Sequence, residues 1–493
     1  MWTRSVAVCI LLAAAPGYRP AAGSADPVDR YRTQRLSWTG CDPAEPRLEC
    51  ATFQAPRDWR RPGAGPDVTL AVSRLATAGP HRRGILILDG GGPSSNLDLP
   101  LDYAGTPLAG GYDLIGYDPR GIGRSSRIHC LTAAELTDYL RVDARDRSAA
   151  NVARIQRNAR ATAQACTSRS GDLLRYVGTE QIAGDLDLIR ALLGEPRTNF
   201  LGFSAGSWFG AYYATLFPDR VGRFVLDSNT EFTATMQTVV DNQPAAFQRR
   251  FDRDFLPWLA RHDATYHYGG TPARVRDRWE ARRAALRREP LRLPGTTTLG
   301  PADLDNVTAA LLYHQDDFPL LAQVLSIVDR FGTATGAERA LLADLFNGPP
   351  GDPDVLAMYL AITCNDTPWT RDPAYWVRHS GAVGRRYPLQ GYQLLFQPCA
   401  YWPFRPQRPP HITGAGVPPV LMVNSVHDPA TPYEGAVRAH RGFAGSRLLT
   451  VRGSGDHVNY GRGNACVDGV VERFLLTGTL PRADASCPGQ PLP

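Results

Sequence analysis

The 493-residue sequence predicts an α/β protein with a mostly parallel, doubly wound sheet and an inserted helical domain. Apolar blocks that end in turns, at 84–92 and 112–126, are typical of buried strands. A helical pattern at 179–195 follows them, and strands that alternate with helices indicate parallel pairing. The stretch 231–415 is instead helical, arginine-rich and broken by proline and glycine, which indicates a cap inserted over the sheet.

The elements of the expected sheet come from both ends of the chain. Residues 50–59 and 68–76 alternate between apolar and polar side chains, as two antiparallel strands would. The helix between the early strands is expected to have Thr179 as its N-terminal cap. Two further apolar strands, within 416–432 and 446–460, come after the insertion, and a closing helix follows them.

We therefore expect four segments along the chain. An export signal occupies 1–25, because Arg4 precedes a short apolar run that ends in small residues suited to cleavage. The first part of the core spans 26–230, the cap spans 231–415 and the second part of the core spans 416–493. A buried N-terminal helix is the alternative for the first segment. The protein is accordingly expected to be secreted, without a membrane anchor, and monomeric.

The cysteines of the mature chain are expected to form disulfides, because an exported protein meets an oxidising compartment. Cys9 falls inside the signal, so an even number of the nine cysteines remains. Their spacing makes four short-range pairs the simplest assignment: Cys41 with Cys50, Cys130 with Cys166, Cys364 with Cys399, and Cys466 with Cys487. The sequence has no CxxC or HExxH spacing, and His262 and His267 fit no strong metal pattern, so no metal is expected.

The charged residues exclude several chemistries. All 54 basic residues are arginine, and the absence of lysine excludes a Schiff-base lysine, a Ser-Lys dyad and a P-loop. The net charge of +6 is spread along the chain, with one concentration at 273–292. The helical spacing of that segment fits a solvated helix face better than a nucleic-acid-binding stripe. We therefore expect no nucleic-acid partner and no cofactor.

Residues 201–210, LGFSAGSWFG, place Ser204 between Gly202 and Gly206, after a strand and before a helix. Such a Gly-x-Ser-x-Gly turn lifts a serine above the sheet, and the amides of the following helix suit an oxyanion. With 47 glycines in the chain the motif can arise by chance. Its partners therefore decide whether Ser204 is a nucleophile or an ordinary turn residue.

A nucleophilic serine needs a base, and the base needs an acid to orient it, in the chain order Ser, Asp or Glu, His. Asp428 and His457 each follow one of the two late strands, at the edge where parallel sheets keep their sites. His427 is the alternative base, although it adjoins the acid, and Asp456 is the alternative acid, although it adjoins the base. We expect Ser204, Asp428 and His457 to form a triad.

An oxyanion hole is expected next to this triad. The first donor would be the N–H of Ala205, directly after the nucleophile. The second would come from the backbone of the loop DGGGPSS after an earlier strand, where Gly91 and Gly92 are the candidates. A flexible connector is the alternative interpretation of this loop.

Several motifs together carry a family resemblance. They are CATFQAPRDW, GGGPSS, YDPRGIGRSS, GFSAGS, HDPATPYEGA and GNACVDGVVERFLLTGTLP. From Trp38 to Pro481, and least in the cap, the chain resembles the secreted tripeptidyl aminopeptidases of the α/β-hydrolase fold, which are related to prolyl aminopeptidases. The resemblance implies a serine exopeptidase whose helical cap closes one end of the cleft and measures residues from a free N-terminus. It gives the roles of nucleophile, acid and base to Ser204, Asp428 and His457.

An aminopeptidase also needs a carboxylate to pair with the substrate ammonium, because a buried unpaired charge is costly. Glu231 and Asp366 stand where the resembled family has acidic residues, and a solvent-facing acid is the alternative for each. The chain departs from the family pattern in the DGGGPSS loop, in AGS after the serine and in GDHVN around the base.

The sequence thus predicts a secreted serine exopeptidase that releases short peptides or amino acids from free N-termini through an acyl-enzyme. An esterase or amidase acting on a non-peptide metabolite is the first alternative. A non-catalytic binding protein on the same scaffold is the second. The expected partner is a peptide or small-molecule substrate.

Overall fold

The structure is a computed structural model that describes residues 26–493, except 296–297, 348–350 and 407–408. The export signal expected at 1–25 lies outside the described residues. None of the described helices is both long and apolar enough to cross a membrane.

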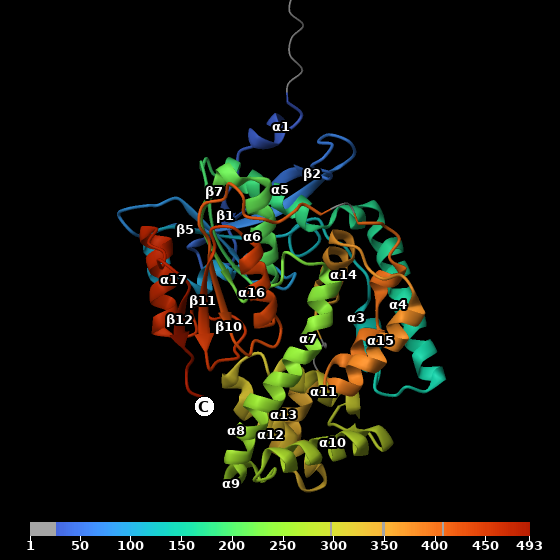
Figure 1. The fold of residues 1–493 in the computed structure, drawn as a ribbon. Coiled ribbons are helices and arrows are strands. Elements are labelled where there is room, and N and C mark those ends of the chain that lie inside the picture. The colour runs from blue at the N-terminus through green and yellow to red at the C-terminus, as the bar shows by residue number, and fades with distance from the viewer. Residues whose placement is uncertain (1–25, 296–297, 348–350, 407–408) are drawn as a thin grey trace, which may run out of the picture.

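A ten-stranded sheet lies in the upper part of the molecule in Figure 1. Its strand order is β1-β2-β3-β5-β4-β6-β7-β10-β11-β12. The first strands along this order, as far as β5, pair antiparallel, and all later pairs are parallel. The strands are β1 (Thr39–Gly40), β2 (Leu48–Pro56), β3 (Asp67–Leu75), β4 (Ile85–Asp89), β5 (Asp113–Asp118), β6 (Thr198–Phe203), β7 (Val221–Asp227), β10 (Leu421–Ser425), β11 (Arg447–Arg452) and β12 (Ala485–Pro488). This sheet confirms the predicted α/β class and the assembly of the sheet from both ends of the chain.

The inner parallel strands are apolar along most of their length because helices cover both faces of the sheet. In β4, Ile85 and Ile87 belong to the core on one face, and Leu86 and Leu88 to the core on the other. The helices on the first face are α5 (Thr179–Leu192), α6 (Ala205–Leu216) and α16 (Tyr433–Gly442), and the second face carries α17 (Ala465–Thr477).

One helix of this layer begins differently from the prediction. Thr179 is the first residue of α5 and Gly178 is its N-cap, without a side-chain cap bond. The Thr179 hydroxyl and amide donate instead to Asp366, at 2.5 and 2.9 Å. A tertiary partner far away in the chain has therefore replaced the local cap.

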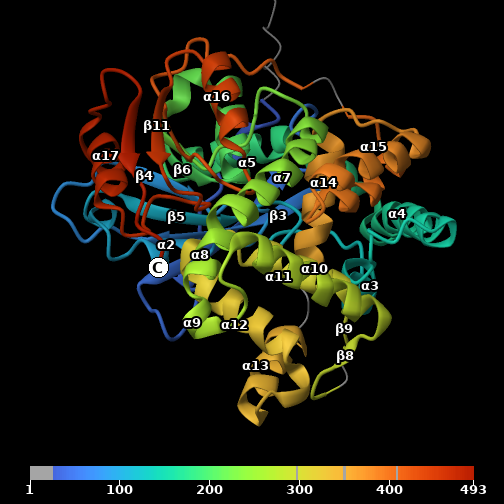
Figure 2. The ribbon, with the colours of Figure 1, turned by 60° about the horizontal axis from the view of Figure 1, so that its bottom comes forward.

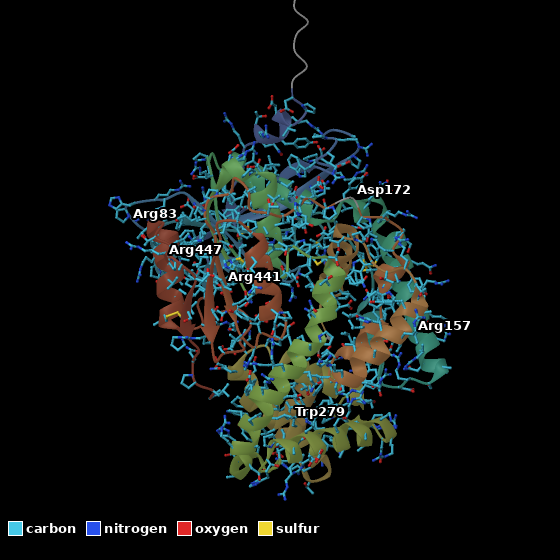
Figure 3. The ribbon with its side chains drawn as sticks, in the orientation of Figure 1. Arg83, Arg157, Asp172, Trp279, Arg441 and Arg447 are labelled. Atoms are coloured by element: carbon cyan, nitrogen blue, oxygen red, sulfur yellow. A yellow bond between two sulfur atoms is a disulfide. The ribbon has the colours of Figure 1, made fainter. Side chains whose placement is uncertain are left out.

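The segment between β7 and β10 is helical, apart from the short pair β8 (Leu291–Arg292) and β9 (Thr298–Leu299). Its helices are α7 (Met236–Arg250), α8 (Leu256–Arg261), α9 (Asp263–Tyr266), α10 (Pro272–Arg288), α11 (Pro301–Ala310), α12 (Phe318–Asp329), α13 (Gly336–Asn347), α14 (Pro353–Asp366) and α15 (Pro373–Arg386). The end of α7 and the helices up to α13 surround a separate apolar core that includes Trp279, which Figure 3 places at the bottom of the molecule.

The later helices of this segment pack closer to the sheet. Ala357, Met358 and Ala361 of α14 join the same apolar core as α5 and α6. Figure 2 shows α14 and α15 on the side of the molecule that carries α4 (Ala149–Ser170). The remaining helices are short: α1 (Asp29–Arg32), α2 (Leu99–Asp102) and α3 (Ala133–Leu140). Helix α14 thus packs against the core of the sheet, whereas the helices before it have a core of their own.

Four disulfides link elements that are near in sequence. They join Cys41 to Cys50, Cys130 to Cys166, Cys364 to Cys399, and Cys466 to Cys487, which are the expected pairs. The third bond ties the end of α14 to the short helical turn η8 (Pro398–Tyr401), and the fourth ties α17 to the edge strand β12.

Candidate active site

Ser204 occupies the turn between β6 and α6, at the carboxyl edge of the sheet. Its backbone has φ 53° and ψ −118°, a conformation that a residue with a side chain adopts only when its surroundings enforce it. The Ser204 N–H donates to the Asp227 carbonyl at 2.9 Å, which fixes the turn to the end of β7. This is the strained geometry that lifts a nucleophilic serine above a sheet.

The two glycines of the motif are required by their neighbours. A Cβ on Gly202 would lie 2.4 Å from the Phe200 ring, and one on Gly206 would lie 2.8 Å from Asp89 Oδ1. Both distances are too short for an ordinary carbon contact. The turn can therefore be this tight only with glycine at both positions.

Asp428 and His457, the expected acid and base, are in direct contact. His457 Nδ1 lies 3.0 Å from each carboxylate oxygen of Asp428. The buried carboxylate also accepts from the Ala430 N–H at 2.9 Å, and from the Thr431 N–H and hydroxyl at 2.8 and 2.9 Å. These donors fix its orientation. Asp428 can therefore hold a proton on His457 Nδ1 and leave Nε2 free to accept one.

The turns that carry Ser204 and His457 are anchored on one residue, Asp227. Its carbonyl binds the Ser204 turn, and its buried carboxylate accepts from the N–H groups of Asn459 and Tyr460, at 2.9 and 2.7 Å. Within the described chain, no hydrogen bond joins the Ser204 hydroxyl to His457. Catalytic hydrogen bonds often tighten only in the substrate complex. The structure thus brings the expected acid and base together and holds the expected nucleophile on the same anchor.

Of the two loop glycines, Gly92 has the freer amide. The Gly91 N–H donates to Asp89 Oδ1 at 3.0 Å, whereas no acceptor in the described chain binds the N–H of Gly92 or Ala205. Gly92 and Ala205 also line the cavity that Ser204 faces. Gly91 has a steric role instead, because a Cβ on it would lie 2.6 Å from Ser204 Cβ.

The glycine loop is held in place by Asp89, at the end of β4. Its carboxylate accepts from the Gly91 N–H and from the Tyr117 hydroxyl. Burial raises the pKa of Asp89 to about 6, although these hydrogen bonds lower it. The loop is therefore a fixed wall of the site rather than a loose connector.

The helical insertion contacts the base directly. The backbone N–H of His457 donates to the backbone carbonyl of Tyr313 at 2.9 Å. The two side-chain rings meet edge to face, with 5.3 Å between their centroids. Burial raises the pKa of the Tyr313 hydroxyl to about 12, so this group stays protonated. His457 is therefore positioned by the insertion as well as by the sheet.

A buried arginine at the end of α7 joins the residues beside the acid and the base. Arg250 donates to Asp254 at 2.8 Å, to Asp456 at 2.6 Å and to the Leu312 carbonyl at 3.2 Å. Asp254 in turn contacts His427 Nδ1 at 2.9 Å. His427 and Asp456, the alternative base and acid, are thus engaged by the insertion.

The loop before the base fits closely around this arginine. A Cβ on Gly455 would lie 2.4 Å from Arg250 Nη1, so glycine is needed for the approach. A π-helical turn, η4 (Phe251–Phe255), follows Arg250 directly. The wider turn breaks the regular helix at the point where the arginine meets the catalytic loop, as such turns often do at functional sites.

A cavity of about 230 Å³ opens beside Ser204. Its walls come from the sheet loops, with Gly92 and Thr431, and from the insertion, with Val239 and Tyr313. No acidic or basic side chain is among the described residues that line it. The cavity can therefore receive an uncharged acyl group next to the nucleophile.

Neither acid that was expected to bind a substrate ammonium lines this cavity. Glu231 forms two hydrogen bonds of 2.7 Å with Arg438 of α16. Asp366, at the end of α14, accepts from Thr179 and from the Trp208 indole N–H at 3.2 Å. Burial raises the pKa of Asp366 to about 6 despite these bonds. Both carboxylates have partners within the protein, and their role toward a substrate stays a prediction.

Sequence reasoning did not single out Asp227, Arg250 or Tyr313. Asp227 had a readable signal, because a carboxylate at the end of a buried parallel strand lies at the edge where such sheets bind ligands. Arg250 and Tyr313 had none, since each lies in a helical segment with many similar residues. Their contacts depend on how the insertion folds back on the sheet.

The comparisons with known proteins agree with this geometry. Residues 85–317 match the family model of the alpha/beta hydrolase fold, and residues 387–487 match that of the TAP-like protein. The tripeptidyl aminopeptidase of Streptomyces lividans is 35% identical over 489 residues, which cover 95% of this chain and 89% of the relative. Carboxylesterase B of Mycobacterium tuberculosis is 32% identical, covering 92% and 89%. Serine protease Hip1 of the same organism is 29% identical, covering 99% and 97%. The chain belongs to the tripeptidyl aminopeptidase-like family of serine hydrolases with the α/β-hydrolase fold.

Proposed function

We propose that this protein is a secreted serine aminopeptidase that releases short peptides or amino acids from free N-termini. The observation that carries the proposal is the buried Asp428–His457 pair, anchored with Ser204 on one strand end beside a cavity. Membership in a family that includes a tripeptidyl aminopeptidase supports the peptide substrate. Four disulfides support secretion, because such bonds persist in oxidising compartments.

In the proposed mechanism, Ser204 Oγ attacks the carbonyl carbon of the scissile bond while His457 Nε2 takes the hydroxyl proton. Asp428 keeps Nδ1 protonated and stabilises the imidazolium that forms. The N–H groups of Ala205 and Gly92 donate to the oxyanion. His457 then gives its proton to the leaving amine, and a water activated by the same histidine hydrolyses the acyl-enzyme.

The insertion gives this site the character of an exopeptidase. Helices α7 and α14 and the residue Tyr313 form walls of the cavity beside Ser204. A wall on the acyl side limits how much chain can precede the attacked bond. The bond that is cleaved is therefore counted from the end of the peptide.

An esterase acting on a non-peptide metabolite is the second candidate. Two observations favour it: the 32% identity to a carboxylesterase, and the absence of a carboxylate among the described residues that line the cavity. An ammonium buried there would lack a counter-charge, whereas an ester would need none.

The test is hydrolysis of matched chromogenic mono-, di- and tripeptidyl amides with free and acetylated amino termini, by purified mature protein. Cleavage of the free forms supports the aminopeptidase, and the longest form cleaved efficiently gives the number of residues released. In Ser204→Ala, kcat should fall by about 10⁴-fold or more. Indifference to acetylation, or activity on simple esters alone, would establish the esterase instead.

A further inference from the structure

A second chamber adjoins the cavity beside Ser204. It has a volume of about 170 Å³ and shares four lining residues with that cavity: Val240, Gln243, Tyr359 and Thr363. Because the same side chains border both spaces, the chamber lies directly next to the active-site cavity, on the side of the insertion. Together the two spaces reach the lower end of the roughly 300–1,000 Å³ typical of small-ligand pockets.

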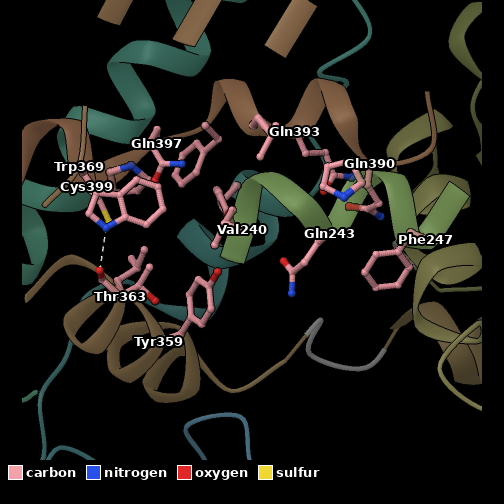
Figure 4. A pocket seen from close by; sticks show the side chains of 16 residues that line it. Val240, Gln243, Phe247, Tyr359, Thr363, Trp369, Gln390, Gln393, Gln397 and Cys399 are labelled. Atoms are coloured by element: carbon pink, nitrogen blue, oxygen red, sulfur yellow. Dashed lines mark hydrogen bonds between the residues drawn. The ribbon is translucent and has the colours of Figure 1, made fainter. Parts of the chain in front are cut away.

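Four glutamines gather around this chamber (Figure 4). Gln243 comes from α7, and Gln390, Gln393 and Gln397 come from the segment that follows α15. Figure 4 shows Gln243 and Tyr359 reaching into the space from α7 and α14. Polar groups from three parts of the insertion thus converge on one volume.

The carboxamides of these glutamines are largely unused by the protein. Gln390 and Gln397 make no side-chain hydrogen bond within the described chain, although Gln397 is only 7% exposed. Gln243 Nε2 donates to the Ala430 carbonyl at 2.8 Å, and Gln393 Nε2 to Asn306 Oδ1 at 3.2 Å, while neither Oε1 accepts from the described chain. A carboxamide without a partner in the protein can exchange its bonds to water for bonds to a ligand.

The chamber is also electrically neutral. No arginine, histidine, aspartate or glutamate is among the described residues that line it. The Tyr359 hydroxyl is protonated at neutral pH, as an ordinary tyrosine is, and can donate a hydrogen bond. An ionised group that entered would lose hydration without gaining a counter-charge.

One wall of the chamber is fixed covalently. Cys399 lines the space two residues after Gln397, and its disulfide partner Cys364 lies on α14, the helix of Tyr359. The Trp369 indole N–H donates to the Thr363 carbonyl at 2.8 Å and closes the same corner (Figure 4). The glutamine segment is thus held at a set distance from α14.

We propose that this chamber binds the residue that precedes the attacked residue of the peptide, and that it selects side chains that are uncharged and form hydrogen bonds, such as glutamine or asparagine. The inference rests on the proposed peptidase function and adds the side-chain class to it. The carboxamides of Gln390 and Gln397 bind the substrate side chain, because in these two neither the oxygen nor the nitrogen has a hydrogen-bond partner in the described chain.

The first experiment uses free-amine peptidyl amides with one fixed attacked residue and Gln, Leu, Glu or Lys directly before it. The glutamine substrate should have a kcat/KM about tenfold or more above those of the glutamate and lysine substrates, since only the charged side chains lose hydration uncompensated. Equal rates for all four substrates would overturn the inference while leaving the peptidase intact. If none of these peptides is cleaved but a simple ester is, the proposed function falls and the inference falls with it.

The second experiment reverses the preference. The double variant Gln390→Glu, Gln397→Glu places carboxylates in the chamber, and the lysine-to-glutamine ratio of kcat/KM should rise by about tenfold or more. The midpoint of its urea denaturation should match that of wild type, which shows that the variant is folded. Gln323→Glu, at an exposed position of α12, is the matched control and should leave the ratio unchanged. An unchanged ratio in the double variant overturns the inference.

Discussion

The two sides of the active site differ in the charge of their side chains. Behind the base, Asp227, Arg250 and Asp428 are fully buried, and each has several charged or polar partners. On the substrate side, the cavity and the glutamine chamber have no charged lining residue in the described chain. A buried ion network is costly to break and therefore holds geometry, whereas neutral amides can exchange water for substrate at low cost. Charged groups thus fix positions on one side of the site, and neutral groups line the spaces on the other.

The largest expected effect is a difference in kcat between variants of two carboxylates near His457, Asp428 and Asp456. Asp428→Asn should lower kcat by about 10⁴-fold, because the amide favours the wrong tautomer of His457. Asp456→Asn should lower it by no more than about tenfold, since Asp456 contacts Arg250 and the Gln315 N–H instead. Steady-state kinetics of the two variants checks this. The reverse order of effects would show that Asp456 is the orienting acid.

A second variant removes a cation from the charged side of the site and leaves the substrate side unchanged. Arg250→Met leaves the partly buried Asp254 and Asp456 without this cation, and should lower the free energy of unfolding by about 3 kcal/mol. Adding Asp456→Asn to this variant should recover part of the loss, which a denaturant titration of both proteins measures. In any folded variant, the ratio of kcat/KM between the glutamine and lysine substrates should stay as in wild type. A change in selectivity would contradict the division between the two sides.

A matched pair of glycines tests the boundary between the sides. Gly91→Ala should lower kcat by about 10²-fold or more, because its Cβ would lie 2.1 Å from the Phe203 carbonyl oxygen and displace the oxyanion loop. Gly92 has no heavy atom within 4 Å of the position of a Cβ, although its φ of 43° disfavours alanine. Gly92→Ala should therefore cost less, mainly in KM. Equal losses in kcat would contradict the steric role of Gly91 beside Ser204.

A further expected effect concerns the pH dependence of stability. Burial raises the pKa of Asp366 to about 6, above its ordinary value, so the folded protein favours the protonated form. Its contribution to stability is therefore present at low pH and is lost as pH rises through about 6, by about 3 kcal/mol at most. The difference in unfolding free energy between wild type and Asp366→Asn should change over that range. Burial also raises the pKa of Asp89 to about 6, so the wild-type stability curve alone would mix both groups. The difference in unfolding free energy between wild type and Asp366→Asn isolates the contribution of Asp366.

The same variant, together with Glu231→Gln, tests the expected ammonium site. Asp366 accepts a hydrogen bond from Thr179, and Glu231 accepts two from Arg438. We therefore expect the ratio of kcat/KM between free and acetylated peptides to change by less than about threefold. A collapse of that ratio in either variant would show that the carboxylate binds the substrate ammonium.

The sequence predicted most clearly what depends on position along the chain. Ser204, Asp428 and His457 each follow a strand, and strand ends meet at one edge of a parallel sheet, so their approximate meeting was readable. Gly91 and Gly92 could not be told apart, because the distinction rests on the bond between Gly91 and a side chain. The partners of Glu231 and Asp366 were hidden, since Arg438 and Thr179 lie about two hundred residues away from them in the chain.

The double anchorage on Asp227 also sets the order in which the site comes into being. The nucleophile turn and Asp227 belong to the early half of the chain, but the amides that bind the Asp227 carboxylate are those of Asn459 and Tyr460, near its end. Synthesis and folding from the N-terminus therefore produce the serine long before its base. A chain that ends before His457 carries Ser204 without the histidine expected to activate it, and so should not hydrolyse the peptides around it.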